Sequence, residues 1–293
     1  MKLRAIGFER QNLDEIPLAA INPFRIIEED GKIGVEHYFT PHRKIIIPAE
    51  YDYIERIGAH SDIFFIVGVN KKYGVYNSEG KLIIDVIYDR IYRGFYEFIL
   101  VRKGKYRGAY DFEGNHIVPD KYKNISAHGD IIRVETYSKL FGAYDYQGNH
   151  IVPNKFLWID LMSFSDESEE FIYVEKKAGN FGVYNKKGKE IVPAIYNKIT
   201  LGKNFIIANT SNSNFTSTVY SYDGSVLLPT MEGHAYHDWN GIAIWYWASN
   251  GVVVCDEKGK EFEPGVRYKG IFSMHDEFFA VQLEGKWKVL LNK

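Results

Sequence analysis

The side chains of this sequence that are best suited to chemistry gather between residues 231 and 247. His234, His237 and Asp238 form a His-x-x-His-Asp group, in which two imidazoles and a carboxylate could approach one metal ion. The group lies in an expected loop, and no fourth ligand accompanies it. We therefore expect surface histidines and no metal site. Neither histidine is paired with a nucleophile, so the sequence predicts no acid–base catalyst.

Aromatic residues follow these histidines closely. Trp239 comes next, and further on Trp245 and Trp247 alternate with Ile244 and Tyr246 along an expected strand. Alternate residues of a strand point to opposite faces, so we expect one pair of side chains to be exposed or interfacial. The rings either form a binding surface, including a platform for a sugar, or fill an enlarged core layer. The residues predicted to bind a partner are His234, His237, Trp239, Trp245, Tyr246 and Trp247.

Familiar catalytic motifs are missing from the sequence. It contains no glycine-rich phosphate loop between a strand and a helix, no Gly-x-Ser-x-Gly elbow and no Cys-x-x-Cys pair. We therefore expect no catalytic residue, no cofactor and no enzymatic activity. Cys255 is the only cysteine, so no intrachain disulfide can form, which indicates a reducing compartment. Its place beside Asp256 in an expected strand is typical of a small core residue.

Composition limits the class of partner. The 293 residues are 45% hydrophobic and 16% aromatic, which suits half-buried strand surfaces. The formal net charge of −2 favours neither nucleic acid nor an anionic membrane. The basic residues at 102–107 are explained as charges that keep an exposed strand edge from pairing with another strand. The N-terminal segment lacks the apolar stretch of a signal peptide and no run is long enough to span a membrane, so we expect a soluble, cytoplasmic protein.

The elements that must position these side chains repeat along the chain. The sequence FGVYNKKGKEIVPAIY at residues 181–196 shows one unit most clearly. Its head is a small residue, and the heads recur 34 to 40 residues apart, at Gly34, Gly74, Gly108, Gly142, Gly182, Thr218, Val253 and Lys288. A glycine recurs six residues after the head, at Gly80, Gly114, Gly148, Gly188, Gly224 and Gly259. A period of this length indicates tandem structural repeats.

Each unit predicts short β-strands and no helix. Residues 181–184 favour a strand, and Asn185 to Gly188 favour a turn in which the Asn side chain bonds the backbone ahead. Because Asn, Asp or Ser recurs at this first turn position, the sequence predicts a hairpin with a glycine bulge in each unit.

The second half of the unit predicts three more strands. Pro193 is expected to end the second strand, because proline lacks the N–H that pairing needs. Tyr196 and Ile199 indicate a short third strand, and residues 205–208 a fourth. An aromatic residue recurs eight residues after the turn glycine, at Tyr88, Tyr122, Phe156 and Tyr196.

The heads of the units resemble a known family. Tyr73-Gly74-Val75, Phe141-Gly142-Ala143 and Phe181-Gly182-Val183 are similar to the bacterial WG repeat, with Tyr or Phe in place of most tryptophans. Trp287 alone keeps the indole, beside a Lys where the family has Gly. The resemblance covers residues 30 to 293 and is specific for the type of repeat. It implies binding modules or proteins of unassigned role, with no shared catalytic residue.

Two architectures fit the repeats. A β-propeller-like ring of 7–8 units needs blades of about four strands, which units of this length supply. The alternative is an open, twisted β-stack or solenoid. Residues 24–39 and 268–291 each hold only part of a unit. This arrangement resembles a propeller in which both ends of the chain close the ring, and it favours a ring. In either case we expect one repeat array over residues 1–293, with residues 1–30 as a lead-in.

The sequence favours a non-enzymatic scaffold or adaptor that binds another protein. Tandem β units without a catalytic constellation are the reason, and an accessory or immunity-type role is compatible with them. The irregular unit at 226–262 is the expected binding surface. The alternative is a propeller that binds a glycan or small ligand, motivated by the aromatic content. A third reading is a structural spacer within an assembly, and the sequence leaves the oligomeric state open.

Overall fold

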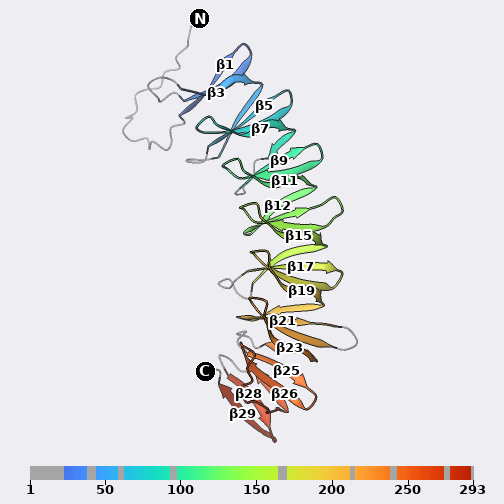
Figure 1. Cartoon of the computed structure of the whole chain (residues 1–293). Helices are drawn as coiled ribbons and strands as arrows, with labels where there is room; N and C mark the ends of the chain where they lie inside the picture. The colour runs from blue at the N-terminus through green and yellow to red at the C-terminus, as the bar shows by residue number, and fades with distance from the viewer. Residues whose placement is uncertain are drawn as a thin grey trace, which may run out of the picture. The chain divides into compact units, whose positions relative to one another are not determined.

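The computed structural model describes residues 23–37, 44–58, 63–92, 98–163, 170–211, 215–237, 243–273 and 278–291. The regular elements of these residues are β-strands, and antiparallel strands pair in their order along the chain (Figure 1). The prediction of an all-β fold of tandem hairpins is confirmed. Within the described ranges there is no long apolar helix of the kind that spans a lipid bilayer.

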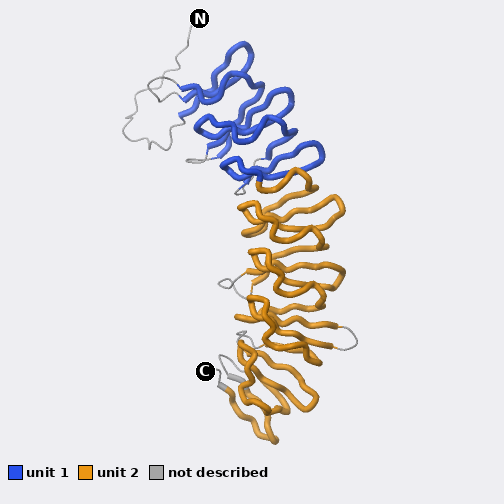
Figure 2. Tube along the Cα trace, viewed as in Figure 1, with its two compact units in different colours: residues 1–116 blue, residues 117–293 orange. Residues whose placement is uncertain are grey.

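The chain divides into two units, residues 1–116 and residues 117–293 (Figure 2). Unit 1 holds three sheets. Sheet 1 contains β1 (Phe24–Glu29), β2 (Lys32–His37) and β3 (Lys44–Tyr51). Sheet 2 contains β4 (Tyr53–Ile57), β5 (Phe64–Val69), β6 (Lys72–Asn77) and β7 (Leu82–Tyr88). Sheet 3 contains β8 (Arg90–Tyr92), β9 (Ile99–Lys103) and β10 (Tyr106–Tyr110) in this unit. Its fourth strand is β11 (His116–Tyr122), and the boundary between the two units follows the first residue of this strand.

Unit 2 continues with five sheets. Sheet 4 contains β12 (Asn124–His128), β13 (Ile131–Glu135), β14 (Phe141–Tyr144) and β15 (His150–Phe156). Sheet 5 contains β16 (Trp158–Met162), β17 (Phe171–Lys177), β18 (Asn180–Asn185) and β19 (Glu190–Tyr196). Sheet 6 contains β20 (Lys198–Leu201), β21 (Phe205–Asn209), β22 (Thr216–Ser221) and β23 (Val226–Glu232). Sheet 7 contains β24 (Ala235–His237), β25 (Ala243–Ala248) and β26 (Gly251–Asp256), and sheet 8 contains β27 (Gly270–Ser273), β28 (Phe278–Leu283) and β29 (Lys286–Leu291).

The predicted turn forms between the third and fourth strands. In sheet 5 the Asn185 Oδ1 accepts hydrogen bonds from the backbone N–H groups of Lys187 (3.1 Å) and Lys189 (2.9 Å). Gly188 takes a φ of +85°, which side chains other than glycine rarely adopt. Tyr184 then pairs with Glu190, while Val183 pairs with Val192, so the register shifts at the turn. The predicted glycine bulge is confirmed.

A second bulge corrects the prediction for Pro193. Strand β19 does not end at this proline but continues to Tyr196, which pairs with Phe181. Between these pairs, Gly182 alone lies opposite residues 193–195, so Pro193 sits in a bulge where its missing N–H removes no ladder bond. Tyr196 is therefore the last residue of β19. The prediction that it lies in the following strand is wrong, because that strand, β20, begins at Lys198.

The head glycine is required by this bulge. A Cβ atom at Gly182 would lie 2.7 Å from the carbonyl oxygen of Val192 and 2.7 Å from the backbone nitrogen of Ala194. Both are backbone atoms, so neither can move aside as a flexible side chain would. The close approach therefore explains why small residues recur at the heads.

Replacing this glycine should destabilise the fold. We expect Gly182→Ala to lower the free energy of unfolding by about 1–3 kcal/mol, because the methyl group overpacks the bulge. Gly270→Ala is the matched control, since its added Cβ would meet no atom closer than 3.7 Å. Urea denaturation of both variants tests this, and equal stability of the two would contradict the steric explanation.

Consecutive sheets share their cores within each unit. Val75 of sheet 2 packs in one cluster with Val101 of sheet 3, and Val192 of sheet 5 with Ile206 of sheet 6. The opposite face of sheet 5 carries Val174, which packs towards sheet 4. A sheet with two apolar faces needs a neighbour on each side, as expected for stacked repeats. The choice between a ring and an open stack for the whole array stays a prediction.

Pairs of tyrosine hydroxyls join neighbouring sheets. The recurring aromatic residue that ends the fourth strand is buried against a tyrosine on the third strand of the next sheet, edge to face. The hydroxyl pairs are Tyr51 with Tyr76 (2.9 Å), Tyr88 with Tyr110 (2.6 Å), Tyr122 with Tyr144 (2.8 Å) and Tyr196 with Tyr220 (2.7 Å). Each bond satisfies two polar groups inside an apolar layer.

The pattern changes at two positions, at one partner in the first and at both partners in the second. Phe156 has no hydroxyl, and Tyr184 beside it bonds Glu190 instead; burial and this glutamate raise the pKa of Tyr184 to about 12. Further on, Glu232 replaces the recurring aromatic residue, and Cys255 replaces its tyrosine partner. Cys255 is fully buried, and burial raises the pKa of its thiol to about 12, in keeping with the predicted core role.

A double-mutant cycle should isolate one of these hydroxyl bonds. Tyr196→Phe is expected to cost about 1–3 kcal/mol of unfolding free energy, because it leaves the Tyr220 hydroxyl buried without its partner. The double variant Tyr196→Phe/Tyr220→Phe should cost less than the sum of the single variants, since both polar groups are gone. Additive losses, measured by urea denaturation, would contradict a direct bond between the hydroxyls.

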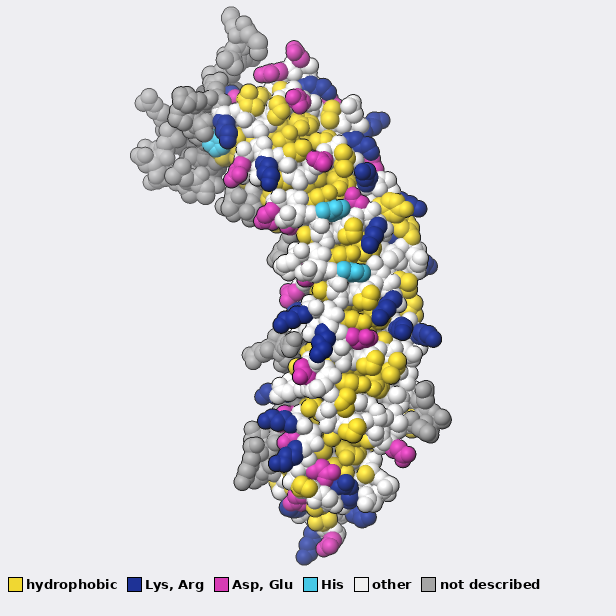
Figure 3. Space-filling model, viewed as in Figure 1, with side chains coloured by type: hydrophobic (Ala, Val, Ile, Leu, Met, Phe, Trp, Pro, Cys, Tyr) yellow, Lys and Arg dark blue, Asp and Glu magenta, His cyan; other side chains and the backbone are white. Residues whose placement is uncertain are grey.

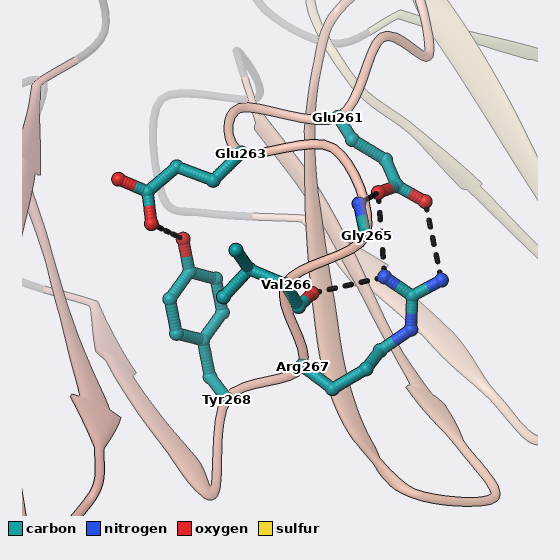
Figure 4. Close-up of polar contacts among 6 residues, drawn as sticks. All are labelled: Glu261, Glu263, Gly265, Val266, Arg267 and Tyr268. Carbon is teal, nitrogen blue, oxygen red and sulfur yellow. Dashed lines mark hydrogen bonds and ion pairs between the residues drawn. The ribbon is translucent and has the colours of Figure 1, made fainter.

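Sheet 7 lacks a fourth strand, and a loop at residues 261–268 takes its place (Figure 4). Tyr268 lies nine residues after the turn glycine Gly259, one more than in the regular repeat, yet it is buried like its counterparts. Its hydroxyl donates to Glu263 Oε2 (2.9 Å). Glu261 holds the loop by accepting from the Gly265 N–H (2.8 Å) and from the Arg267 guanidinium (3.3 Å).

Candidate functional site

A cavity of about 570 Å³ opens in unit 1 between sheet 2 and the edge strand β8 of sheet 3. Its apolar wall includes Ile66 and Ile91, which are 4% and 9% exposed and belong to the core that the two sheets share. This volume falls within the range of small-ligand sites. No motif in the sequence predicted this cavity.

Three tyrosines form most of the remaining wall. Tyr53 and Tyr73 lie edge to face, with ring centroids 5.9 Å apart. Tyr53 is 43% exposed, and its hydroxyl donates to Glu55 Oε2 (2.5 Å). Tyr92 enters from strand β8, where the Arg90 guanidinium lies over its ring at 4.9 Å. The cavity therefore combines aromatic rings with two carboxylates, Glu55 and Asp89, and the Arg90 guanidinium.

Asp89, at the start of β8, is already engaged. Its carboxylate accepts from Lys72 Nζ (2.5 Å) and from the Gly104 N–H (2.5 Å). The Lys72 ammonium and the backbone N–H hold the pKa of this carboxyl below its ordinary value. The charge of Asp89 is thus balanced by a lysine, and Glu55 and Arg90 also line the cavity.

The register position of Ile66 differs among the sheets, and sheets 3 and 6 also have an aliphatic residue there, Leu100 and Ile207. Ile66 pairs with Glu55 across the first two strands of sheet 2. At the same register position sheet 4 has Arg133, which reaches the carbonyl of Ile159 (3.4 Å), and sheet 5 has Tyr173. Tyr173 stacks on Phe181 at 5.1 Å and fills the equivalent space in sheet 5.

The predicted histidines lie at the first strand of sheet 7. His234 precedes β24 and packs edge to face against Phe215, with ring centroids 4.9 Å apart. His237 ends β24, with its ring 6.0 Å from Phe205. Asp238 lies outside the described residues. Both rings are thus placed against aromatic neighbours.

The predicted tryptophans separate. Trp245 is half-buried in the core shared with sheet 8, and Tyr246 is half-buried against sheet 6. Trp247 is 51% exposed. Trp239 lies outside the described residues. Both faces of strand β25 therefore meet a neighbouring sheet, and Trp247 is the described member of the group that protrudes most.

Exposed hydrophobic side chains are also scattered over the repeats, among them Leu82, Ile195 and Val226. Figure 3 shows hydrophobic side chains interspersed with charged ones on the face that it presents. Single residues of this kind are ordinary on protein surfaces. They do not by themselves mark a site.

The outer face of sheet 8 is different, because its exposed apolar side chains adjoin. Phe272, Trp287 and Val289 are 65%, 59% and 51% exposed. Phe272 and Val289 lie in one cross-strand row, on either side of the small Ala280. The Trp287 ring reaches back across the sheet to Gly270, whose added Cβ would lie 3.7 Å from it. We call the three exposed residues the terminal face.

The opposite face of sheet 8 carries Val281 and Leu290, which pack with Val254 of sheet 7. Sheet 8 is therefore apolar on both faces, like the inner sheets. In the sequence, Trp287 and Val289 alternate with lysines along the last strand, and this alternation was a signal for the terminal face. From the sequence, Trp287 was considered only as a residue that resembles the family.

Comparison with known proteins supports the type of repeat. The family model described as "WG containing repeat" matches residues 38–73, 73–106 and 181–206, about a third of the chain. No curated protein matches the sequence.

Similar solved structures include Hsv2p of Kluyveromyces lactis, with 11% identity over 78% of this chain and 94% of that chain and a TM-score of 0.27. BamB from Moraxella catarrhalis has 10% identity over 88% of this chain and 92% of that chain, with a TM-score of 0.25. The computationally designed Ika8 protein has 11% identity, 93% and 94% coverage, and a TM-score of 0.26. These scores are too low to add to the fold assignment, which rests on the sheets themselves.

The matched segments 73–106 and 181–206 each contain the head, the turn and the bulge described above. Tyr73 and Phe181, which precede the heads Gly74 and Gly182, stand where the family has its tryptophan. At these positions the matches support a WG-repeat assignment, with tyrosine or phenylalanine in place of the tryptophan that gives the repeat its name.

Proposed function

We propose that this protein is a non-enzymatic scaffold that binds a protein partner through the terminal face of sheet 8. The observation that carries the proposal is the adjacency of Phe272, Trp287 and Val289, each more than half exposed. A group of adjoining exposed apolar side chains is typical of an interaction surface.

The composition of the terminal face suits a protein partner. Trp is enriched among residues that dominate binding energy, and an aromatic anchor beside an aliphatic side chain can fill a complementary pocket. We therefore expect a partner that offers a complementary apolar pocket.

The test is a pull-down of the tagged full chain from its native cells at moderate salt, with mass spectrometry, followed by titration of the purified partner. Phe272→Ser and Trp287→Ser should each weaken binding roughly tenfold or more, because each removes an exposed anchor. Ile195→Ser is the matched control, since Ile195 is 57% exposed on sheet 5. All three variants should keep the thermal stability of the parent.

Two outcomes would contradict the proposal. A partner that binds the Phe272→Ser/Trp287→Ser variant as tightly as the parent would place the interface elsewhere. Loss of binding in Trp247→Ser alone would favour the surface expected from the sequence at residues 226–262.

An empty pull-down with a folded protein would favour the second candidate function, which is binding of a small ligand or glycan. The specific observation for that function is the cavity in unit 1.

A further inference from the structure

We infer that three arginines of sheet 3 bind the phosphate group of a small phosphate monoester, whose apolar part enters the cavity of unit 1. Arg90 of β8 pairs with Arg102 of β9, and Arg102 pairs with Arg107 of β10. The three side chains therefore stand side by side on one face of the sheet, with neighbouring Cβ atoms about 5 Å apart. We call them the arginine row. The row and the cavity both lie in unit 1, so this inference does not depend on the terminal face.

Protection of a strand edge does not account for the row. Strand β9 pairs with β8 on one side and with β10 on the other, so Arg102 stands on an inner strand. The explanation of the basic residues at 102–107 as charges on an exposed edge is therefore wrong for Arg102. Equal charges directly opposite one another destabilise a sheet, and a bound anion would remove that cost.

The other four-stranded sheets have no such row. The middle residue of the equivalent row in sheets 2, 4, 5 and 6 is Gly68, Glu135, Glu175 and Asn209, respectively. Lys198 of sheet 6 is the single positively charged residue of these four described rows. Three arginines in one row are thus a feature of sheet 3 and not of the repeat.

Two of the three guanidinium groups meet at one aromatic ring. The Arg90 guanidinium lies 4.9 Å from the centroid of the Tyr92 ring, and the Arg107 guanidinium lies 5.6 Å from it. Arg102 stands between them in the row, and its Nε atom is buried without a hydrogen-bond partner among the described residues. A buried donor without an acceptor costs free energy, and an oxyanion would supply the acceptor. Arginine suits phosphate because its planar fork can donate two parallel hydrogen bonds.

Asp89 precedes the row in the chain, and its carboxylate is already engaged. Its oxygens accept from Lys72 Nζ (2.5 Å) and from the Gly104 N–H (2.5 Å), and Arg102 acts on it by Coulombic attraction. Lys72 thus balances Asp89. Arg90 and Arg102 then carry two positive charges, which match the charge of about −1.5 to −2 on a phosphate monoester at pH 7.

Glu55 and Arg107 carry opposite charges at the border of the site. Glu55 lines the cavity and accepts from the Tyr53 hydroxyl (2.5 Å), and both Glu55 and Arg107 have further interactions. We therefore assign neither of them a bond to the ligand. The negative charge of Glu55 keeps an anion out of the cavity itself, which places the phosphate at the row and the apolar part of the ligand inside.

The cavity is suited to that apolar part. Arg90 and Tyr92 line the cavity as well as the row, so a ligand held at the row can extend into the volume of about 570 Å³. Tyr53 and Tyr73 lie edge to face in its wall, with ring centroids 5.9 Å apart. An aromatic group of the ligand can pack against these rings.

The test uses the full chain and phenyl phosphate, with binding measured by calorimetry. We expect a Kd below about 1 mM, and at least tenfold weaker binding of inorganic phosphate, benzoate and benzyl alcohol. Arg90→Gln and Arg102→Gln should each weaken the binding of phenyl phosphate roughly tenfold, because each removes a charged donor. Arg90 is exposed, so its replacement leaves the core untouched.

Two further variants locate the ligand. Arg56→Gln is the matched control, since Arg56 alternates with Glu55 in strand β4 and lies on the opposite face from the cavity. It removes the same charge from unit 1 and should leave binding unchanged. Tyr53→Ala should weaken the binding of phenyl phosphate and leave that of inorganic phosphate unchanged, because only the apolar part meets this ring.

Four results would overturn the inference. The first is a protein that is folded by circular dichroism and does not bind phenyl phosphate. The second is an equal loss of binding in Arg56→Gln, which would indicate attraction by overall charge. The third is benzoate or benzyl alcohol binding as tightly as phenyl phosphate, since the phosphate would then not be recognised. The fourth is binding that survives Arg90→Gln/Arg102→Gln or that ignores Tyr53→Ala, which would place the ligand elsewhere. None of these results bears on partner binding by the terminal face.

Discussion

Sheets 2, 5, 6 and 7 are apolar on both faces, and the fold depends on that constraint. Val174 and Val192 of sheet 5 belong to different cores, one shared with the sheet before it and one with the sheet after it. A single sheet of three or four strands could not keep both faces from water. The hydroxyl pairs and the bulges serve this packing, because they satisfy buried polar groups and let neighbouring backbones approach closely.

Both candidate sites lie where this sharing of faces is incomplete. At the cavity, the shared core of sheets 2 and 3 leaves Tyr53 and Tyr73 beside an open space. At the terminal face, Phe272 and Trp287 are exposed on a sheet whose other side packs against sheet 7. In both cases the ordinary alternation of the strands produces the apolar surface.

The sequence predicted the strands and turns well because their signals are local. The Asn or Asp of the turn and the glycine three residues on need no tertiary information. The bulge at Pro193 was missed because it depends on how Gly182 approaches the opposite backbone, and Tyr196 was assigned to the wrong strand as a result. The cavity was invisible for a related reason, since the register that aligns Ile66 with Arg133 and Tyr173 comes from pairing between strands.

The loop at residues 261–268 shows how such a chain can change over evolutionary time. One additional residue between Gly259 and Tyr268 accompanies the loss of a whole strand, although the tyrosine still reaches its buried place. Duplication or deletion of a complete repeat, by contrast, leaves every contact between neighbours in register. Recombination in multiples of the repeat length is therefore the tolerated route for lengthening or shortening this chain, and small insertions in the gene are confined to the loops.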